Sequence, residues 1–327
     1  MVNNQTNKML KIEHTPLVSI IVITYNSSKY VLETLESTKE QTYQNIELII
    51  TDDCSTDDTV EVCKNWLAIN KSRFINTELI TVQNNTGIPA NCNRGIRAMK
   101  GEWLKLIAGD DILLDSCISD NVHYINENSK ATIVFSQVKT FSDNVNNGEI
   151  RPKNGSYFHS LEAEQQYKLL LIGDVISYTP SAFIQKKQIE SLSFYDEKYT
   201  YIEDYPFWLK ATKNNVKLHF FETVTVLYRI HSASIYHSLK ANSKKSVTGK
   251  RLHFLQLRKD LVYPHYSQLK LYREQYADYL AFKFKNVNAN SFSSFLYKLA
   301  TLYLNPFIHV SLILKKIFRL KNIDFNF

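Results

Sequence analysis

Glycine, proline and long apolar runs are scarce in this sequence. Its 327 residues include 8 glycines and 7 prolines, which excludes collagen-like and proline-rich low-complexity chains. No stretch reaches the roughly 18 uninterrupted apolar residues of a membrane-spanning helix. The polar start MVNNQTNKMLKIEHT lacks the apolar centre of a secretory signal. Hydrophobic residues make up 44% and aromatic residues 13% of the chain, so we expect a folded protein with a large core.

The four cysteines form no recognisable pair or cluster. They are Cys54, Cys63, Cys92 and Cys117, without a CxxC spacing and without histidines at zinc-site spacing. We therefore expect reduced, mostly packed thiols, which are typical of a cytosolic protein.

Two glycine-rich loops that bind phosphate are also absent. The sequence has no GxGxxG after its first predicted strand and no GxxxxGK followed by Ser or Thr. A dinucleotide dehydrogenase or a P-loop NTPase uses such a loop to place phosphate at a helix N-terminus. Their absence favours a divalent metal ion as the partner of any bound phosphate.

The first 111 residues alternate between predicted strands and helices. The run LVSIIVITYN at 17–26 is apolar on both faces, which is typical of a central parallel strand covered by helices. The full pattern predicts strands at 17–26, 46–55, 76–83 and 102–111, with helices at 27–41, 56–70 and 88–100. This order predicts a doubly wound, mostly parallel α/β sheet.

Polar residues follow three of these strands. The three clusters are Thr24-Tyr25-Asn26, Asp52-Asp53 and Gly109-Asp110-Asp111. Ligands of doubly wound sheets bind beyond the carboxyl ends of the strands, so we expect the clusters to face one crevice. Mg²⁺ or Mn²⁺ would relieve the repulsion between the two adjacent carboxylates of the third cluster. The alternative is a simple turn, in which Gly-Asp is common and Asp caps the next helix.

The second half of the chain is less regular. The sequence predicts a surface loop at 142–156, a helix at 161–171, a short strand at 179–187, an amphipathic helix within 201–212 and a strand at 223–231. Glu203 and Asp204 lie just ahead of that helix, where acidic residues would also suit the helix dipole. His231 ends the last strand, and its alternative is a structural role.

Five pieces of the sequence resemble a known family. They are VSIIVITYN, QTYQNIELIITDDCSTDDT, NNTGIPANCNRGIRAMKGEWLKLIAGDD, YIEDYPFWLKA and YRIH. In this order and spacing they resemble the inverting glycosyltransferases of family 2, bacterial enzymes of surface-polysaccharide synthesis with the GT-A nucleotide-sugar-binding fold. The resemblance runs from Pro16 to Ser238, about two thirds of the chain.

The resemblance implies a donor site and a metal site. The residues that it assigns to the nucleobase are Thr24, Tyr25, Asn26 and Asp53, and those in the segment that closes on the donor are Gly87 and Asn93. It assigns Asp110, Asp111 and His231 as ligands of a Mn²⁺ or Mg²⁺ ion on the donor diphosphate. It also assigns Asp110 to the residues that bind the donor. Many members have an Asp-x-Asp-Asp element, and this chain departs from it because Ala108 replaces the first carboxylate.

The resemblance also implies a catalytic base. Asp204 matches the carboxylate that takes the proton of the acceptor hydroxyl while that hydroxyl attacks the anomeric carbon. Glu203 matches a residue that orients the base or binds the acceptor, and Asp196-Glu197 match a further acidic position. The expected enzyme moves a sugar from a nucleotide-sugar to a glycan or lipid-linked acceptor. We expect the nucleotide to be UDP.

The region after residue 240 carries the positive charge. Residues 250–323 hold 13 Lys and Arg against Asp260, Glu274 and Asp278, in a chain of net charge +7. We expect a flexible tail at 1–15, a catalytic domain at 16–240 and a basic helical region at 241–327. Apolar residues at helical spacing between lysines favour an interfacial helix on an anionic membrane, at the cytoplasmic face. The alternative is packing on the catalytic domain or on another subunit. No motif indicates nucleic-acid binding.

Two other functions are compatible with parts of this pattern. A nucleotidyltransferase also uses a strand-end carboxylate pair with metal, but it would need no base at Asp204. A catalytically silent carbohydrate- or nucleotide-binding protein is conceivable because of Ala108.

Overall fold

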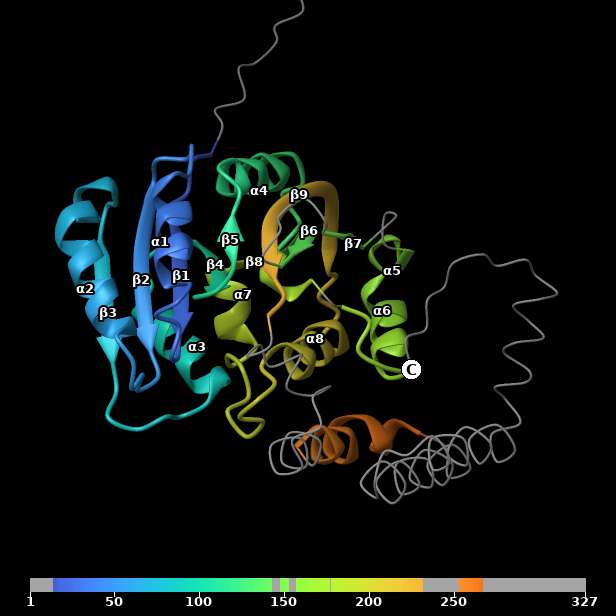
Figure 1. Cartoon of the computed structure of the whole chain (residues 1–327). Helices are drawn as coiled ribbons and strands as arrows, with labels where there is room; N and C mark the ends of the chain where they lie inside the picture. Colours follow the sequence, from blue (N-terminus) through green and yellow to red (C-terminus); the bar gives the residue numbers. More distant parts are fainter. Residues whose placement is uncertain (1–13, 143–147, 153–156, 177, 232–252, 267–327) are drawn as a thin grey trace, which may run out of the picture. The chain divides into compact units, whose positions relative to one another are not determined.

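A computed structural model describes residues 14–142, 148–152, 157–176, 178–231 and 253–266 (Figure 1). The chain divides into two compact units, Met1–Ala241 and Asn242–Phe327. In the second unit the described residues form a π-helical turn, Arg258–Val262, and a 3₁₀ turn, Tyr263–His265. Residues 241–252 and 267–327 of the predicted basic helical region lie outside the described ranges, as do residues 1–13 of the predicted tail.

The first unit contains the predicted α/β alternation. Its first four strands are β1 (Val18–Thr24), β2 (Ile46–Asp52), β3 (Thr77–Thr81) and β4 (Trp103–Ala108), joined by helices α1 (Val31–Lys39), α2 (Thr59–Asn70) and α3 (Ile88–Ala98). These strands are mutually parallel in the order β3-β2-β1-β4. Strand β1 is central and buried along its length, which its continuous β-branched sequence predicts.

The later elements extend the same sheet. They are β5 (Ile112–Leu113), α4 (Cys117–Glu127), β6 (Ile133–Phe141), β7 (Ile150–Arg151), α5 (Tyr157–Ser160), α6 (Ala163–Leu170), the 3₁₀ turn η3 (Thr179–Ser181), β8 (Phe183–Gln185), α7 (Lys186–Ser191), α8 (Asp204–Lys213) and β9 (His219–Arg229). The sheet continues β4-β8-β6-β9-β5, and β7 pairs with β6.

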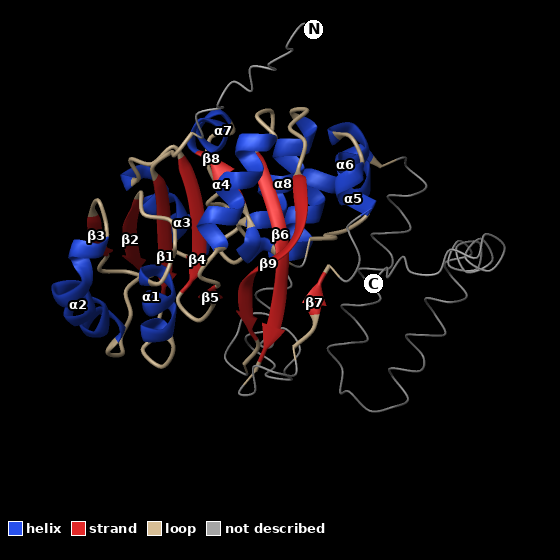
Figure 2. Cartoon of the chain, turned by 90° about the horizontal axis from the view of Figure 1, so that it is seen from above, coloured by secondary structure: helices blue, strands red, loops and turns tan. Residues whose placement is uncertain are grey.

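The sheet is mixed but mostly parallel, as predicted. Strand β8 is antiparallel to β4, and β5 is antiparallel to β9, whereas the long strands β6 and β9 are parallel to each other. Right-handed crossovers place α1 and α2 on one face of the sheet and α3, which returns across it, on the other (Figure 2).

Several strand boundaries differ from the sequence prediction; β2 ends at Asp52 rather than at residue 55, and β8 begins at Phe183 rather than at residue 179. Strand β4 ends at Ala108 rather than at residue 111, because the chain turns at Gly109 and enters β5. Strand β9 begins at His219, before the predicted start at 223. Within the predicted loop 142–156, residues 150 and 151 form strand β7 against β6; residues 143–147 and 153–156 lie outside the described ranges.

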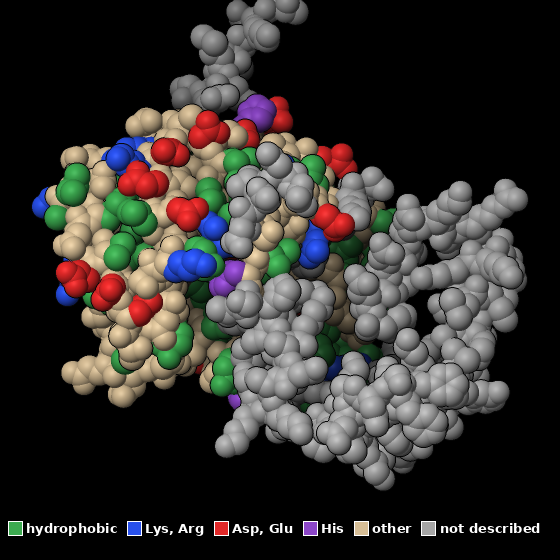
Figure 3. All heavy atoms as spheres, viewed as in Figure 1, with side chains coloured by type: hydrophobic (Ala, Val, Ile, Leu, Met, Phe, Trp, Pro, Cys, Tyr) green, Lys and Arg blue, Asp and Glu red, His purple; other side chains and the backbone are tan. Residues whose placement is uncertain are grey.

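The surface of the first unit carries both charges. On the face shown in Figure 3, both Lys and Arg side chains and Asp and Glu side chains are scattered over the described residues. Among the described helices, none is long and apolar enough to cross a membrane.

Candidate active site

The ends of β1, β2 and β4 bring the three polar clusters to one edge of the sheet. Thr24 and Asp52 are register partners, and the Thr24 hydroxyl donates to Asp52 Oδ2 at 2.7 Å. Gly109 lies so close to β1 that a Cβ there would be 2.9 Å from the Thr24 methyl carbon. The clusters therefore share one edge, as expected from strands that run parallel.

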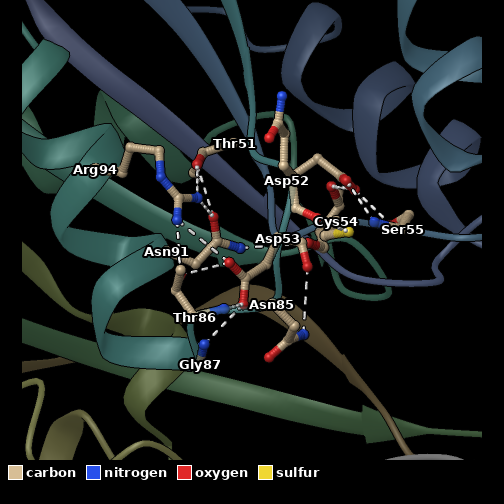
Figure 4. Close-up of polar contacts among 12 residues, drawn as sticks. Thr51, Asp52, Asp53, Cys54, Ser55, Asn85, Thr86, Gly87, Asn91 and Arg94 are labelled. Atoms are coloured by element: carbon tan, nitrogen blue, oxygen red, sulfur yellow. Dashed lines mark hydrogen bonds and ion pairs between the residues drawn. The ribbon is translucent and has the colours of Figure 1, made fainter.

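Asp53 holds the loop that leads into α3 (Figure 4). Its Oδ2 accepts hydrogen bonds from the backbone N–H groups of Thr86 (2.9 Å) and Gly87 (2.8 Å). Its Oδ1 accepts from the Thr86 hydroxyl (2.6 Å) and from Arg94 Nη2 (3.2 Å). A carboxylate has about four acceptor positions, so a nucleobase N–H that bound Asp53 would replace one of these donors.

Gly87 is required by the backbone at this loop. Its φ is +92°, and a Cβ would lie 2.8 Å from the carbonyl oxygen of Thr200. A side chain at this position would be strained by its conformation and by this contact. Gly87 thus keeps the loop close to Thr200, in the segment that leads to Glu203 and Asp204 at the start of α8.

The other predicted donor residues differ in their surroundings. Tyr25 is 51% exposed at the edge of the sheet, so its ring is accessible. Asn26 has a φ of +50°, and its side-chain oxygen accepts from the backbone N–H of Thr56 at 2.8 Å. Asn93 is buried, and its amide bonds both the backbone of Tyr195 and the Glu197 carboxylate. The donor-binding roles of these residues stay predictions.

Asp110 and His231 form the candidate metal pair. Strand β9 ends beside the turn after β4, and His231 Nε2 lies 2.9 Å from Asp110 Oδ2. Both side chains keep some solvent contact, at 15% exposure for His231 and 27% for Asp110. Asp111 is 1% exposed and accepts the backbone N–H of Arg229. Burial and the charge of Asp110 raise the pKa of Asp111 well above its usual value.

Arg229 holds the backbone beside this pair in place, and the sequence alone did not indicate a role for it. Its Nε donates to the Asp110 carbonyl at 2.7 Å, and its Nη2 donates to Glu33 Oε2 at 2.8 Å. Its guanidinium lies 4.5 Å from the Tyr30 ring centre and 4.4 Å from that of Phe141. The Arg side chain is thereby fixed between two aromatic rings. Its place two residues before His231 in YRIH was the available signal.

A second acidic group lies at the N-terminus of α8. Glu203 and Asp204 are half-buried, and burial together with the Asp204 charge raises the pKa of Glu203 to about 8. Burial also raises the pKa of Asp204, but hydrogen bonds from Thr179 and the Tyr205 backbone favour its charged form. Near neutral pH we therefore assign the negative charge of this pair to Asp204 and the proton to Glu203.

Asp174, in the segment between α6 and η3, joins this group and was not selected from the sequence. The residue keeps solvent contact, but the protein packed around its carboxyl and the charge of Asp204 raise its pKa to about 8. No motif surrounds Asp174, and a residue whose neighbours come only from the fold cannot be identified from its local sequence.

Two side chains, the half-buried Tyr228 and the buried Cys92, lie within electrostatic reach of separate parts of the site. On β9, the Tyr228 phenol has a raised pKa, through burial and then the charges of Asp111, Asp110 and Asp204. On α3, burial and the charges of Glu203, Asp204 and Asp53 raise the pKa of the Cys92 thiol. The candidate metal pair, the Asp53 loop and the acidic group of α8 are therefore within electrostatic reach of common neighbours.

Comparison with known proteins identifies the family. The sequence pattern of "Glycosyl transferase family 2" matches residues 19–189. The chain is 30% identical over 222 residues to the Escherichia coli protein named UDP-Glc:alpha-D-GlcNAc-diphosphoundecaprenol beta-1,3-glucosyltransferase WfaP, covering 67% of this chain and 79% of that protein. It is 27% identical over 224 residues to the uncharacterized glycosyltransferase MJ1057 of Methanocaldococcus jannaschii, covering 68% and 73%. The chain belongs to glycosyltransferase family 2.

Solved structures show the same fold. The S. aureus TarS 1–349 crystal structure in complex with UDP-GlcNAc matches with a TM-score of 0.54 at 16% identity, covering 81% of this chain and 80% of that one. The same fragment in complex with UDP matches with a TM-score of 0.53 at 19% identity, covering 80% of each chain. At this identity the likeness concerns the fold, so the site must be argued from this chain's own residues.

Proposed function

We propose that this glycosyltransferase moves a hexose from a UDP-sugar to a hydroxyl of a lipid-linked glycan, with inversion at the anomeric carbon. The observation that carries the proposal is a chain of contacts: Asp204 bonds Thr179 of η3, and η3 contacts β4 and β9, the two strands that lead to Asp110 and His231. A diphosphate site and an acidic group that can serve as base must face each other across one sugar for a single displacement to occur. The names of the UDP-Glc-dependent relative and of the UDP-GlcNAc-bound neighbour support the donor class.

The residues at the strand ends fit a divalent metal ion. Asp110 Oδ2 and His231 Nε2 lie 2.9 Å apart. Among the described residues no cluster of three or more potential metal ligands occurs, so phosphate oxygens and water would have to complete the coordination of the ion. Mg²⁺ and Mn²⁺ are bound in this way in many enzymes, by one or two protein ligands with phosphate oxygens and water. Bound there, the ion would neutralise charge that develops on the leaving diphosphate.

Asp204 is the proposed base. An ionised carboxylate within reach of the acceptor hydroxyl can remove its proton as the oxygen attacks the anomeric carbon from the face opposite UDP. Its raised pKa brings its proton affinity closer to that required near neutral pH. The protonated Glu203 beside it can donate a hydrogen bond to the acceptor. Nothing in the site favours the nucleotidyltransferase alternative, for which Asp204 would have no task.

A donor screen tests the substrate class. We expect UDP-sugars to raise the melting temperature of the protein in the presence of Mn²⁺, and GDP-sugars to do so much less. We also expect slow release of UDP from the correct UDP-sugar in the absence of acceptor. Stabilisation by GDP-sugars alone would refute the UDP assignment. Pyrophosphate release from a nucleoside triphosphate and a sugar phosphate would instead indicate a nucleotidyltransferase.

We also propose that the basic C-terminal region attaches the enzyme to an anionic membrane, where a lipid-linked acceptor would lie. A full-length variant with Lys315, Lys316, Arg319 and Lys321 changed to Gln should bind anionic vesicles at least tenfold more weakly, because each basic residue contributes on the order of 1 kcal/mol at such a surface. A matched control changes the exposed lysines Lys64, Lys130, Lys187 and Lys213 to Gln. Equal vesicle binding by the two variants would show that the C-terminal region has another task.

A further inference from the structure

A buried lysine connects the strand that carries the metal pair with a neighbouring turn. Lys105 lies in the middle of β4 and is fully buried. Its Nζ donates to the carbonyl oxygen of Pro180, the central residue of η3, at 2.8 Å. A buried ammonium group is costly unless it is paired, so this contact ties η3 firmly to β4. A lysine inside an apolar strand matches no motif, so the sequence alone indicates no role for Lys105.

The same turn also contacts the proposed base. The Thr179 hydroxyl donates to Asp204 Oδ2 at 2.7 Å, while the backbone N–H of Tyr205 donates to Asp204 Oδ1 at 2.7 Å. Each carboxylate oxygen thus accepts one hydrogen bond, which fixes the rotation of the carboxylate. The remaining lone pairs stay available for the proton of an acceptor hydroxyl.

The turn depends on its neighbours for its own position. It is a single 3₁₀ turn, with the Ser181 hydroxyl donating to the Tyr178 carbonyl and accepting the backbone N–H of Ser136 on β6. The elements that it contacts include β4, β6 and β9. One turn of helix has little stability by itself, so these contacts decide where the Thr179 hydroxyl lies.

We propose that Thr179 is a positioning residue for Asp204, and that Lys105 fixes the turn from which Thr179 acts. The chain of contacts runs from β4 through Lys105, Pro180 and Thr179 to the carboxylate of Asp204. The strand that presents Asp110 to the donor diphosphate therefore also sets the orientation of the base. This inference rests on the proposed function, in which Asp204 removes the acceptor proton.

Thr179→Val tests the first contact, since valine keeps the shape of threonine without its hydroxyl. We expect a fall in kcat of about 10–100-fold from misorientation of the base, with the KM for the donor unchanged. Thr179→Ser restores the hydroxyl and should recover most of the rate. Thr212→Val is the matched control, because Thr212 lies on α8, the helix that begins at Asp204, and within the described part of the chain its buried hydroxyl bonds only the carbonyls of Trp208 and Leu209.

The pH profile gives a readout that loss of packing alone would not change. The Thr179 hydrogen bond lowers the pKa of Asp204, so its removal should move the acid limb of kcat to higher pH. The titratable groups facing Asp204 from the neighbouring segments are Glu203, Asp174, Cys92, Tyr195 and Tyr228. They are unchanged in Thr179→Val and Thr212→Val, so a shift confined to the former belongs to the lost hydroxyl.

Lys105→Met tests the second contact. We expect a lower kcat, and in the double variant with Thr179→Val a combined loss clearly smaller than the product of the two single losses, because both act on the same carboxylate. Lys186→Met is the control, since the Lys186 ammonium also donates to a main-chain carbonyl, that of Met99. Donor-induced stabilisation checks that each variant is folded.

The outcomes separate this inference from the proposed function. If Asp204→Asn retains full transfer, the base assignment fails. If Asp204→Asn is inactive but Thr179→Val has wild-type kcat and pH profile, the positioning role of Thr179 is wrong. If Thr179→Ser is as slow as Thr179→Val, the hydroxyl is not responsible and the inference is overturned. If the losses of the two single variants multiply in the double variant, Lys105 acts independently of Thr179, and the role proposed for Lys105 is wrong.

Discussion

Replacing Asp204 with asparagine is expected to lower the rate of sugar transfer by about 10²–10⁴-fold, the usual contribution of a general base. The amide keeps the size of the carboxylate and can still accept the Thr179 hydrogen bond, but it cannot take a proton. Affinity for UDP-sugar and for metal should stay near wild type, because Asp204 belongs to the acidic group of α8 and not to the strand-end pair. Steady-state transfer assays combined with calorimetric titration of UDP measure both quantities.

Glu203→Gln is the matched control for this prediction. The pKa of Glu203 is raised to about 8, so the group is mostly protonated at neutral pH and glutamine resembles that form. We expect a loss smaller than that of Asp204→Asn. If Glu203→Gln is the more damaging change, the two carboxyls have exchanged roles. Weaker UDP binding by Asp204→Asn would place Asp204 at the donor, and a product of retained anomeric configuration would exclude a single displacement.

The first half of the fold could be predicted because each strand and helix carries its own periodicity. The buried run of β1 and the polar residues at the ends of β1, β2 and β4 are local signals, and the sheet brings those ends together as expected. The insertion of β8 between β4 and β6, and the pairing of β5 with β9, could not be predicted. They join segments about 80 and 115 residues apart, whose hydrogen bonds leave no periodic trace in either partner.

The candidate site, like the fold, could be predicted from the sequence only in part. Family motifs indicated Asp110, Asp204 and His231, but they could not indicate which atoms are already engaged in the folded chain. Asp53 accepts four protein donors, and the Asn93 amide is occupied by Tyr195 and Glu197. Such occupancy arises from side chains that are distant in sequence, and it requires coordinates.

Removing the carboxylate of Asp110 should have the second large effect. We expect Asp110→Asn to weaken Mn²⁺-dependent UDP binding and to lower kcat by about 10²–10³-fold, the scale of losing one group that stabilises developing charge. Asp111→Asn should affect metal binding less, because Asp111 is 1% exposed and its Oδ1 accepts the Arg229 backbone N–H. An asparagine oxygen can accept the same bond.

Calorimetric titration of Mn²⁺ into the UDP-saturated protein tests this order directly, without relying on turnover. Asp115→Asn is the control, since Asp115 is an exposed aspartate four residues from Asp111. His231→Ala should weaken Mn²⁺ binding in parallel with Asp110→Asn, because the two side chains lie 2.9 Å apart.

If Asp110→Asn and His231→Ala keep wild-type Mn²⁺ affinity while Asp111→Asn loses it, the ion binds deeper, at Asp111. If all three variants keep it, the strand-end carboxylates form only a turn, and UDP must be neutralised by another group.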